Sequence, residues 1–422
     1  MTLSMIITLA VVVLMIVVII SDKLPFGAPA ILAAALLVLL GQADVATAFS
    51  GFADKNVIMV MGTMACSAAL RKTKLVYDLQ RFLSKIASRG GTKTVFLLLL
   101  SLMVVKNVVN IHYTLLIIIL ATIPYNEKLP PSKLLLPALY APSGWLPSGA
   151  VMMIGVIGGL VEGTGMPNTV SVGYYCLAEF LFSMIYLVFA LIMYRVLPNR
   201  DISENLIADG GDGKMPEFVP TLTKLQQNVV YIGFLALLII MTFLQKLPGE
   251  SGYAAGWVIV GLFLCVGALN FKEVCQQAFS PVIIMMASVI GVAATMNNCG
   301  LSGYLGDTLA GVIGTPSQFV LVLIFGLAVS ICSTFTGASF GSLFIFAPIG
   351  ISVCMTMGYN PVPLAYMCVK AAWINYIMPI DGMHAMAMGT GKYKLSEYWA
   401  FMIPMWVVQM LWSAFAAVTF FN

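Results

Sequence analysis

Long apolar runs follow one another along the whole chain, and they constrain the fold more than any other feature of the sequence. Most of them are about 15–25 residues long, which is the length that a helix needs to cross the roughly 30 Å of hydrocarbon in a bilayer. The runs span residues 3–20, 26–41, 56–70, 93–124, 134–163, 171–197, 228–246, 252–270, 280–297, 317–357, 361–389 and 396–421. They lack the alternation of polar and apolar residues that is typical of transmembrane strands. The runs therefore predict an all-α polytopic membrane protein.

The composition excludes most other classes of protein. Of the 422 residues, 60% are hydrophobic and 9% are charged, whereas soluble domains are about a quarter charged. The same numbers argue against nucleic-acid binding and intrinsic disorder. The eight cysteines are scattered singly, without a CxxC pair, so we expect no metal, cofactor or disulfide. No P-loop, HExxH or nucleophile elbow occurs, which indicates that the protein is neither an ATP-driven pump nor an enzyme.

The two halves of the chain resemble each other. A hydrophilic stretch at residues 198–227, which is typical of a loop, separates residues 1–197 from residues 228–422. Each half contains a run that is too long for one crossing and then a run interrupted by glycine and proline. We interpret these as a re-entrant hairpin and a broken helix, the elements that build the site of many secondary transporters. The hairpins are expected at residues 93–124 and 317–357, and the broken helices at residues 134–163 and 361–389.

The basic residues are distributed unevenly over this arrangement of five transmembrane helices per half. Seventeen of the 21 Lys and Arg residues fall on one side, and only Lys55 and Lys246 fall on the other. The positive-inside rule then places residues 198–227 in the cytoplasm and both termini outside. The first hairpin opens from the cytoplasm and the second from outside, so the two repeats are predicted to be inverted. We expect a multi-pass protein of the plasma (inner) membrane.

Polar and ionisable residues within the apolar runs are the candidates for a site, because such residues are costly in lipid. The residues predicted to bind substrate lie at the two hairpin tips and the two helix breaks: Asn107, Asn110, His112, Ser148, Gly149, Thr336, Gly337, Ser339, Pro379 and Asp381. The residues predicted to carry or balance charge are Lys106, Lys370, Asp381 and His384. The alternatives are that both lysines snorkel to the headgroups, that Lys370 pairs with an acidic residue, and that Asp381 and His384 form a hydrogen-bonded helix cap. Glu162 and Glu179 fall near helix ends, and we expect both at the membrane interface.

A series of short motifs resembles one known family, the ion transporter superfamily, which includes the divalent anion/sodium symporters and their citrate and arsenite relatives. The matching segments are residues 24–27 (LPFG), 48–58 (AFSGFADKNVI), 132–141 (SKLLLPALYA), 336–339 (TGAS), 347–349 (API), 378–381 (MPID) and 391–398 (GKYKLSEY). The match covers nearly the whole chain. The resemblance implies a homodimer with an elevator-type mechanism. The hairpins and broken helices would move, and the first two helices and the last helix of each half would form the scaffold.

The motifs that hold sodium in this family are degenerate here. Relatives surround sodium and touch the substrate carboxylates with two Ser-Asn-Thr tips, and residues 109–111 (VNI) and 338–340 (ASF) stand at those places. Valine, isoleucine, alanine and phenylalanine offer a hard cation no side-chain oxygen. The main-chain carbonyls of Gly155, Gly337 and Gly382 are the remaining candidates to bind sodium. No other metal site is expected.

These observations predict a secondary active transporter of small organic anions, in particular di- or tricarboxylates. We expect it to be proton-coupled or to exchange anions, and not to depend strictly on sodium. The alternatives are a sodium/proton antiporter or an inorganic oxyanion permease of the same fold, and a non-transporting membrane receptor. The expected partners are a small anionic substrate, a proton or sodium, the lipid bilayer and a second copy of the chain, with no nucleic acid.

Overall fold

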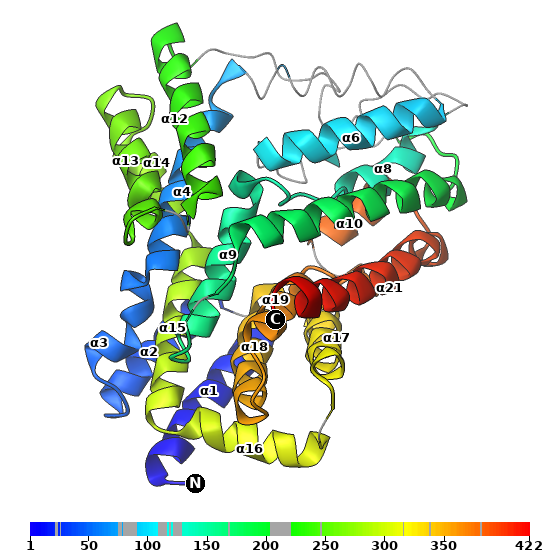
Figure 1. Cartoon of the computed structure of the whole chain (residues 1–422). Coiled ribbons are helices and arrows are strands. Elements are labelled where there is room, and N and C mark those ends of the chain that lie inside the picture. The colour runs from blue at the N-terminus through cyan, green and yellow to red at the C-terminus, as the bar shows by residue number, and fades with distance from the viewer. Residues whose placement is uncertain are drawn as a thin grey trace.

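The structure is a computed structural model, and it describes residues 1–21, 24–25, 27–74, 78, 91–108, 116–117, 120, 129–167, 169–202, 221–244, 247–314, 316–336, 339–379 and 382–422. These residues form helices and connecting segments, with no strand among them. The predicted all-α fold is therefore confirmed (Figure 1).

The described helices fall into two sets, one on each side of residues 203–220. The first half contains α1 (Leu3–Ser21), α2 (Ala28–Leu39), α3 (Val45–Ala48), η1 (Ser50–Ala53), α4 (Lys55–Arg71), α6 (Thr92–Val108), α8 (Pro131–Leu139), α9 (Pro147–Glu162), α10 (Val172–Met193) and η2 (Tyr194–Val196). The second half contains α12 (Lys224–Thr242), α13 (Ser251–Cys265), α14 (Phe271–Ala278), α15 (Pro281–Asn298), α16 (Leu301–Ile313), α17 (Gln318–Thr336), α18 (Ser339–Thr356), α19 (Val362–Ala372), α20 (Gly382–Thr390) and α21 (Leu395–Phe420).

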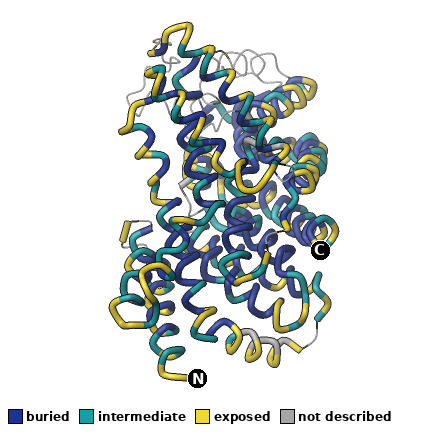
Figure 2. The backbone as a smooth tube through the Cα atoms, turned by 60° about the vertical axis from the view of Figure 1, so that its left-hand side comes forward, coloured by how far each residue is buried: buried dark blue, intermediate teal, exposed yellow. Residues whose placement is uncertain are grey.

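Several helices of the described chain are long and apolar enough to cross a membrane. Five qualify by length and composition, and a sixth span results if the bent pair α14 and α15 is counted as one. Six shorter apolar helices of 10–17 residues accompany them. The outer faces of α10 and α12 expose large apolar side chains, including Val188, Ile192, Ile232 and Leu235. Figure 2 shows the buried positions gathered inside and the exposed ones outside, as expected for a protein surrounded by lipid.

Helix starts in this fold carry clear local signals. The Asp54 carboxylate accepts hydrogen bonds from the backbone N–H groups of Asn56 and Val57 at 2.8 and 3.1 Å and so caps α4. A capping box between Thr223 and Gln226 starts α12 at Lys224, because these side chains satisfy the free N–H groups of the first turn. The last four residues of the loop expected at residues 198–227 are therefore helical.

The two halves are joined by reciprocal packing of helices. Helix α4 of the first half packs along α13 of the second, and α15 of the second half packs along α2 of the first. Gly62 and Gly256 meet where α4 and α13 are closest, since a Cβ on Gly256 would lie 2.8 Å from the Gly62 carbonyl carbon. Small residues allow such close backbone contact between membrane helices.

Helices α10 and α21, the last of each half, run side by side in the other part of the molecule (Figure 1). Helix α10 packs against α6 and α9, and α21 packs against α17 and α19. Helices α17 and α18 pack together as the two arms of a hairpin, and their ends at Thr336 and Ser339 flank the expected second tip. Only α6 of the first hairpin is described in full. The first residues of its expected tip, including Lys106 and Asn107, end α6, and residues 109–112 lie outside the described residues.

Both runs expected to be broken helices consist of two short helices joined by an irregular segment. The first break, residues 140–146, joins α8 to α9. The second break lies between α19 and α20, and the structure describes its residues 373–379. The first break starts eight residues before Ser148, where the sequence was expected to break. Pro142 explains the early end of α8, because the residues before a proline disfavour the helical conformation.

The predicted orientation can be tested by cysteine labelling. In a background where the exposed Cys265 and Cys275 are replaced by serine, we expect a membrane-impermeant maleimide to label Asn422→Cys in intact cells. Lys272→Cys should react only after the membrane is permeabilised, because Lys272 lies on the side with most basic residues. Labelling of Lys272→Cys from outside would show that the orientation is the reverse.

Candidate functional site

A cavity of about 380 Å³ lies where the two breaks, α6, α10 and α21 meet. Its wall is formed by Lys106, Leu116, Leu139, Tyr140, Ala141, Pro142, Ser143, Gly149, Met153, Tyr175, Glu179, Phe182, Val369, Lys370, Trp373, Tyr376, Met383 and Gln409. This volume lies within the range of known small-molecule sites. The cavity therefore draws residues from both halves of the chain.

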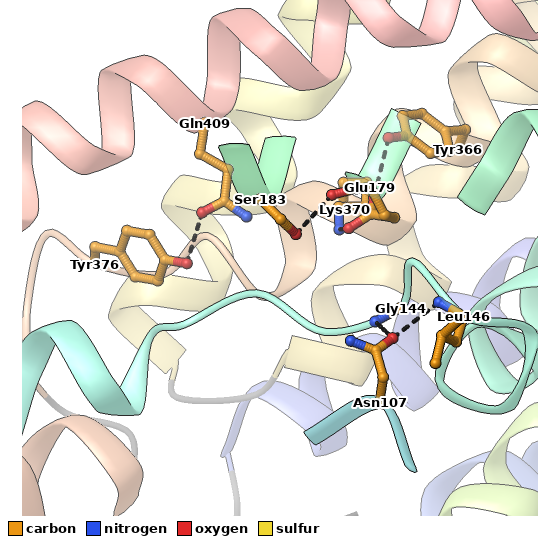
Figure 3. A network of polar contacts seen from close by, with 9 residues as sticks. All are labelled: Asn107, Gly144, Leu146, Glu179, Ser183, Tyr366, Lys370, Tyr376 and Gln409. Carbon is orange, nitrogen blue, oxygen red and sulfur yellow. Dashed lines mark hydrogen bonds and ion pairs between the residues drawn. The ribbon is translucent and has the colours of Figure 1, made fainter. Parts of the chain in front are cut away.

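The side chain of Asn107 binds the backbone of the first break. Its Oδ1 accepts hydrogen bonds from the backbone N–H groups of Gly144 and Leu146 at 2.8 and 2.9 Å, as Figure 3 shows. Its Nδ2 donates to the Met103 carbonyl at 2.7 Å. Gly144 has a φ of +106°, a conformation that L-residues with a side chain rarely adopt. Asn107 thus binds the break, and it is not among the residues that line the cavity.

The ammonium group of Lys106 caps the C-terminal end of α8. It donates to the carbonyls of Leu139 and Ala141 at 2.9 and 2.7 Å. The last carbonyls of a helix have no partner inside the helix and carry partial negative charge. Lys106 satisfies two backbone carbonyls there and at the same time brings a positive charge to the cavity wall.

At the second break, serines of α17 donate hydrogen bonds to backbone carbonyls, as Lys106 does at the first break. Ser333 donates to the Ala372 carbonyl at 2.7 Å, and Ser330 donates to the Ile374 carbonyl at 2.5 Å. The Ser339 hydroxyl lies 3.3 Å from that of Ser333. The inner end of each hairpin therefore supplies donors to the carbonyls that the neighbouring broken helix leaves free.

A buried ion pair joins α10 to the second broken helix. The Glu179 carboxylate lies 2.8 Å from the Lys370 ammonium group and accepts a hydrogen bond from the Tyr366 hydroxyl at 3.3 Å. The Glu179 side chain is 1% exposed and that of Lys370 is 16% exposed. Figure 3 shows the pair near Gly144 of the first break, and a Cβ on Gly144 would lie 3.7 Å from Glu179 Cγ. Glu179 thus lies beside the first break and pairs with the helix before the second.

His384 bridges the two breaks from its position in α20. Its Nδ1 is hydrogen bonded to the Tyr140 hydroxyl, and its Nε2 lies 2.8 Å from Asn375 Oδ1. Asn375 Nδ2 faces the Ser339 hydroxyl at 3.5 Å, so Oδ1 is the atom that accepts from the imidazole. A neutral imidazole has one donor and one acceptor, and this arrangement uses both. His384 is fully buried.

The polarity of the half-helices favours an anion in the cavity. Gly149 near the start of α9 and Met383 near the start of α20 both line it, so two helix N-termini with their partial positive charge face the same space. Lys106 and Lys370 stand at the ends of α8 and α19, where they offset the partial negative charge of the C-termini. The wall therefore combines two positive helix ends with two lysines.

The structure brings some of the residues predicted from the sequence to this cavity and leaves others elsewhere. Lys106, Lys370 and Gly149 line the cavity. Asn107, Ser339 and His384 hold the surrounding breaks through hydrogen bonds. The remaining described positions are Ser148 in the first turn of α9, Thr336 at the end of α17, Pro379 in the second break and Gly382 at the start of α20. Asn110, His112, Gly337 and Asp381 lie outside the described residues.

Glu179 was expected at the membrane interface, and this expectation is wrong. The residue lies two turns inside α10, lines the cavity and pairs with Lys370. A carboxylate within a run of 27 residues that carries no other acidic residue was a usable signal, because buried acids in membrane helices need a partner. Gln409 of α21, which accepts a hydrogen bond from Tyr376 at 2.7 Å, had no comparable signal in the sequence.

Of the carbonyls proposed for sodium, that of Gly155 belongs to the interior of α9. Helix carbonyls accept the hydrogen bond of the residue four positions later. A Cβ on Gly155 would lie 2.5 Å from Val60 Cγ2 of α4, so this glycine faces α4, and it is not part of the cavity wall. This position weighs against a sodium site at Gly155.

Two family models match the chain, and each covers more than half of it. The model described as "Citrate transporter" matches residues 16–277. The model described as "Sodium:sulfate symporter transmembrane region" matches residues 155–422.

Two curated proteins are similar to part of the chain. An uncharacterized transporter of Synechocystis is 24% identical over 189 residues, which are 44% of this chain and 30% of the relative. The sodium-dependent high-affinity dicarboxylate transporter 3 of Caenorhabditis elegans is 25% identical over 187 residues, which are 43% of this chain and 32% of the relative. The aligned part thus spans about a third of the length of these relatives.

Two solved transporters have a similar fold. The YdaH transporter of Alcanivorax borkumensis superposes with a TM-score of 0.59 at 16% identity, over 92% of this chain and 88% of that one. MtrF of Neisseria gonorrhoeae superposes with a TM-score of 0.56 at 16% identity, over 99% of this chain and 95% of that one. With both family models, these findings confirm the resemblance seen in the sequence: the chain belongs to the divalent anion/sodium symporter family of membrane transporters, with its citrate and dicarboxylate permeases.

Proposed function

We propose that the protein is a secondary active transporter of small organic anions, in particular di- or tricarboxylates, in the plasma membrane. The cavity between the two breaks carries this proposal. It has two lysines and two helix N-termini in its wall, and these groups suit a carboxylate at either end of a small molecule. Family membership and the dicarboxylate transporter among the relatives support the same substrate class.

Coupling to protons, or exchange of one anion for another, fits the residues better than strict dependence on sodium. The Ser-Asn-Thr tips of the family are degenerate at residues 109–111 and 338–340. Lys106 and Lys370 line the cavity, and their positive charge offsets the negative charge of an anion, as bound sodium would otherwise do. Gly155 lies inside α9, where a backbone carbonyl accepts a hydrogen bond of the helix.

An elevator-type movement fits the packing if α10 and α21 travel with the broken helices. The Glu179–Lys370 pair joins α10 to α19, and the Tyr376–Gln409 hydrogen bond joins the second break to α21. In the empty carrier, movement of α19 past a fixed α10 would have to break the buried Glu179–Lys370 pair, with nothing to replace either partner, which is costly. We therefore place α10 and α21 in the moving part, although the family resemblance implies that the last helix of each half belongs to the scaffold. The helices around the α4–α13 contact remain in the scaffold of each protomer of a homodimer.

Uptake by purified protein in liposomes tests the proposed function. With a panel of radiolabelled succinate, citrate and sulfate in sodium-free choline buffer, we expect uptake of a carboxylate that increases when the external medium is acidified. An absence of uptake of the whole panel, with and without sodium, would contradict transport. Uptake that only sodium restores would contradict the proposed coupling and leave the transport of anions intact.

Sulfate is included because one observation favours a second function. The model that matches residues 155–422 describes sodium:sulfate symporters, and an inorganic oxyanion would use the same lysines and helix N-termini. Uptake of sulfate without uptake of succinate or citrate would identify the protein as an oxyanion permease.

A further inference from the structure

We propose that Glu179 is the proton-carrying group of this transporter, and that one proton accompanies each dicarboxylate because the substrate takes over the lysine partner of Glu179. This inference rests on the proposed function and adds the residue and the stoichiometry of coupling. In the empty cavity the Glu179 carboxylate pairs with Lys370. When a substrate carboxylate binds Lys370, a proton from the entry side adds to a Glu179 oxygen. On release of the substrate that O–H bond breaks, the proton leaves to the exit side, and the ion pair forms again.

The geometry of the pair makes this substitution feasible. The Lys370 ammonium group has three N–H donors, one of which contacts Glu179 Oε2 at 2.8 Å. The lysine side chain is 16% exposed at the cavity wall, whereas that of Glu179 is 1% exposed. A ligand in the cavity therefore reaches the lysine before it reaches the carboxylate.

The net charge of the cavity wall indicates how many protons accompany each dicarboxylate. Among the described lining residues, Lys106, Lys370 and Glu179 are the ones that carry charge at neutral pH, and together they leave one excess positive charge. A dicarboxylate would bring the loaded cavity to one net negative charge, which is costly within a membrane. One proton on Glu179 makes the loaded cavity neutral.

The groups around Glu179 support its choice as the proton carrier. Titratable or charged groups that face it are Lys370 and Tyr366 from α19, Tyr175 and Cys176 from α10, Lys106 from α6 across the cavity, and Tyr376 from the second break. Tyrosine and cysteine are ordinarily neutral at pH 7, and the lysines are the groups that hold the anion. His384 uses both ring nitrogens to bridge the breaks. Glu179 is the carboxylate of the described cavity wall.

The test compares accumulation and exchange of succinate in liposomes for the wild type, Glu179→Gln and Glu162→Gln. Under an inward proton gradient we expect the wild type to accumulate succinate and to bring protons inside, as reported by a trapped pH dye. Glu179→Gln should lose both the stimulation by the gradient and the proton entry. Its counterflow of succinate at equal pH should fall much less than its accumulation, because in exchange the carrier crosses the membrane only with substrate bound, when the proposal requires a neutral side chain at this position.

Glu162→Gln is the matched control. Glu162 also pairs with a lysine, since Lys55 Nζ lies 3.1 Å from Glu162 Oε1, but it is not part of the cavity wall. This variant should keep the gradient response. Measurable counterflow by Glu179→Gln would show that the variant is folded. If Glu179 had only a structural role, its substitution would not abolish proton coupling while exchange of succinate continued.

Each other outcome counts against a definite part of the proposal. A gradient response that persists in Glu179→Gln, or that is absent from an actively exchanging wild type, would overturn the role of Glu179 and leave transport established. Parallel loss of counterflow and coupling in Glu179→Gln would assign the residue to structure or binding instead. No transport by the wild type would overturn the proposed function itself.

Discussion

Lys370→Gln is expected to destabilise the protein by about 3–5 kcal/mol, because it leaves the buried carboxylate of Glu179 without its partner. Glu179 is 1% exposed and receives one further hydrogen bond, from Tyr366. That neutral donor replaces only part of the interaction that the ammonium group provides. The measurement is the free energy of unfolding in a titration with sodium dodecyl sulfate, beside the melting temperature in detergent.

The double variant Lys370→Gln with Glu179→Gln separates this explanation from a loss of packing. Two amides can hydrogen bond across the same gap, so we expect the double variant to regain most of the lost stability, although its transport should remain poor. Glu179→Gln alone should be milder than Lys370→Gln, because the lysine is 16% exposed to the cavity and keeps access to water. Equal destabilisation by Lys370→Gln and by the double variant would contradict the assignment of the effect to an unpaired charge.

Asn107→Ala should lower the stability by about 2–5 kcal/mol, since it removes the acceptor of two buried backbone N–H groups. These groups belong to Gly144 and Leu146 in the first break. Without the amide the break should lose its shape, and with it the position of the α9 N-terminus at the cavity. We therefore expect substrate uptake to fall together with stability, measured in liposomes and by thermal unfolding.

Asn298→Ala is the control for this substitution. Asn298 is the last residue of α15 and is exposed, and surface substitutions of this kind change stability by only about 0.5 kcal/mol. A wild-type melting temperature for Asn107→Ala would show that the break is held by other contacts.

The sequence alone determined the class of protein and the kind of elements it contains. Run length and composition require helices in a membrane, because only helices satisfy all their backbone hydrogen bonds within one segment of about 20 residues. Glycine and proline marked both broken helices, since these residues weaken a helix. The ordered motifs identified the family, and the family models confirm it. The orientation and the inverted relation of the repeats remain predictions.

Tertiary structure alone decided which polar residues face one another. The Glu179–Lys370 pair joins positions 191 residues apart, and the Tyr140–His384 bridge joins positions 244 residues apart. No local pattern records such pairings, because they depend on the rotation and depth of each helix against its neighbours. The same holds for Asn107, which was expected to face substrate and instead binds the backbone of the first break. The sequence located the polar residues along the membrane, and packing between distant helices determined whether each one lines the cavity or supports it.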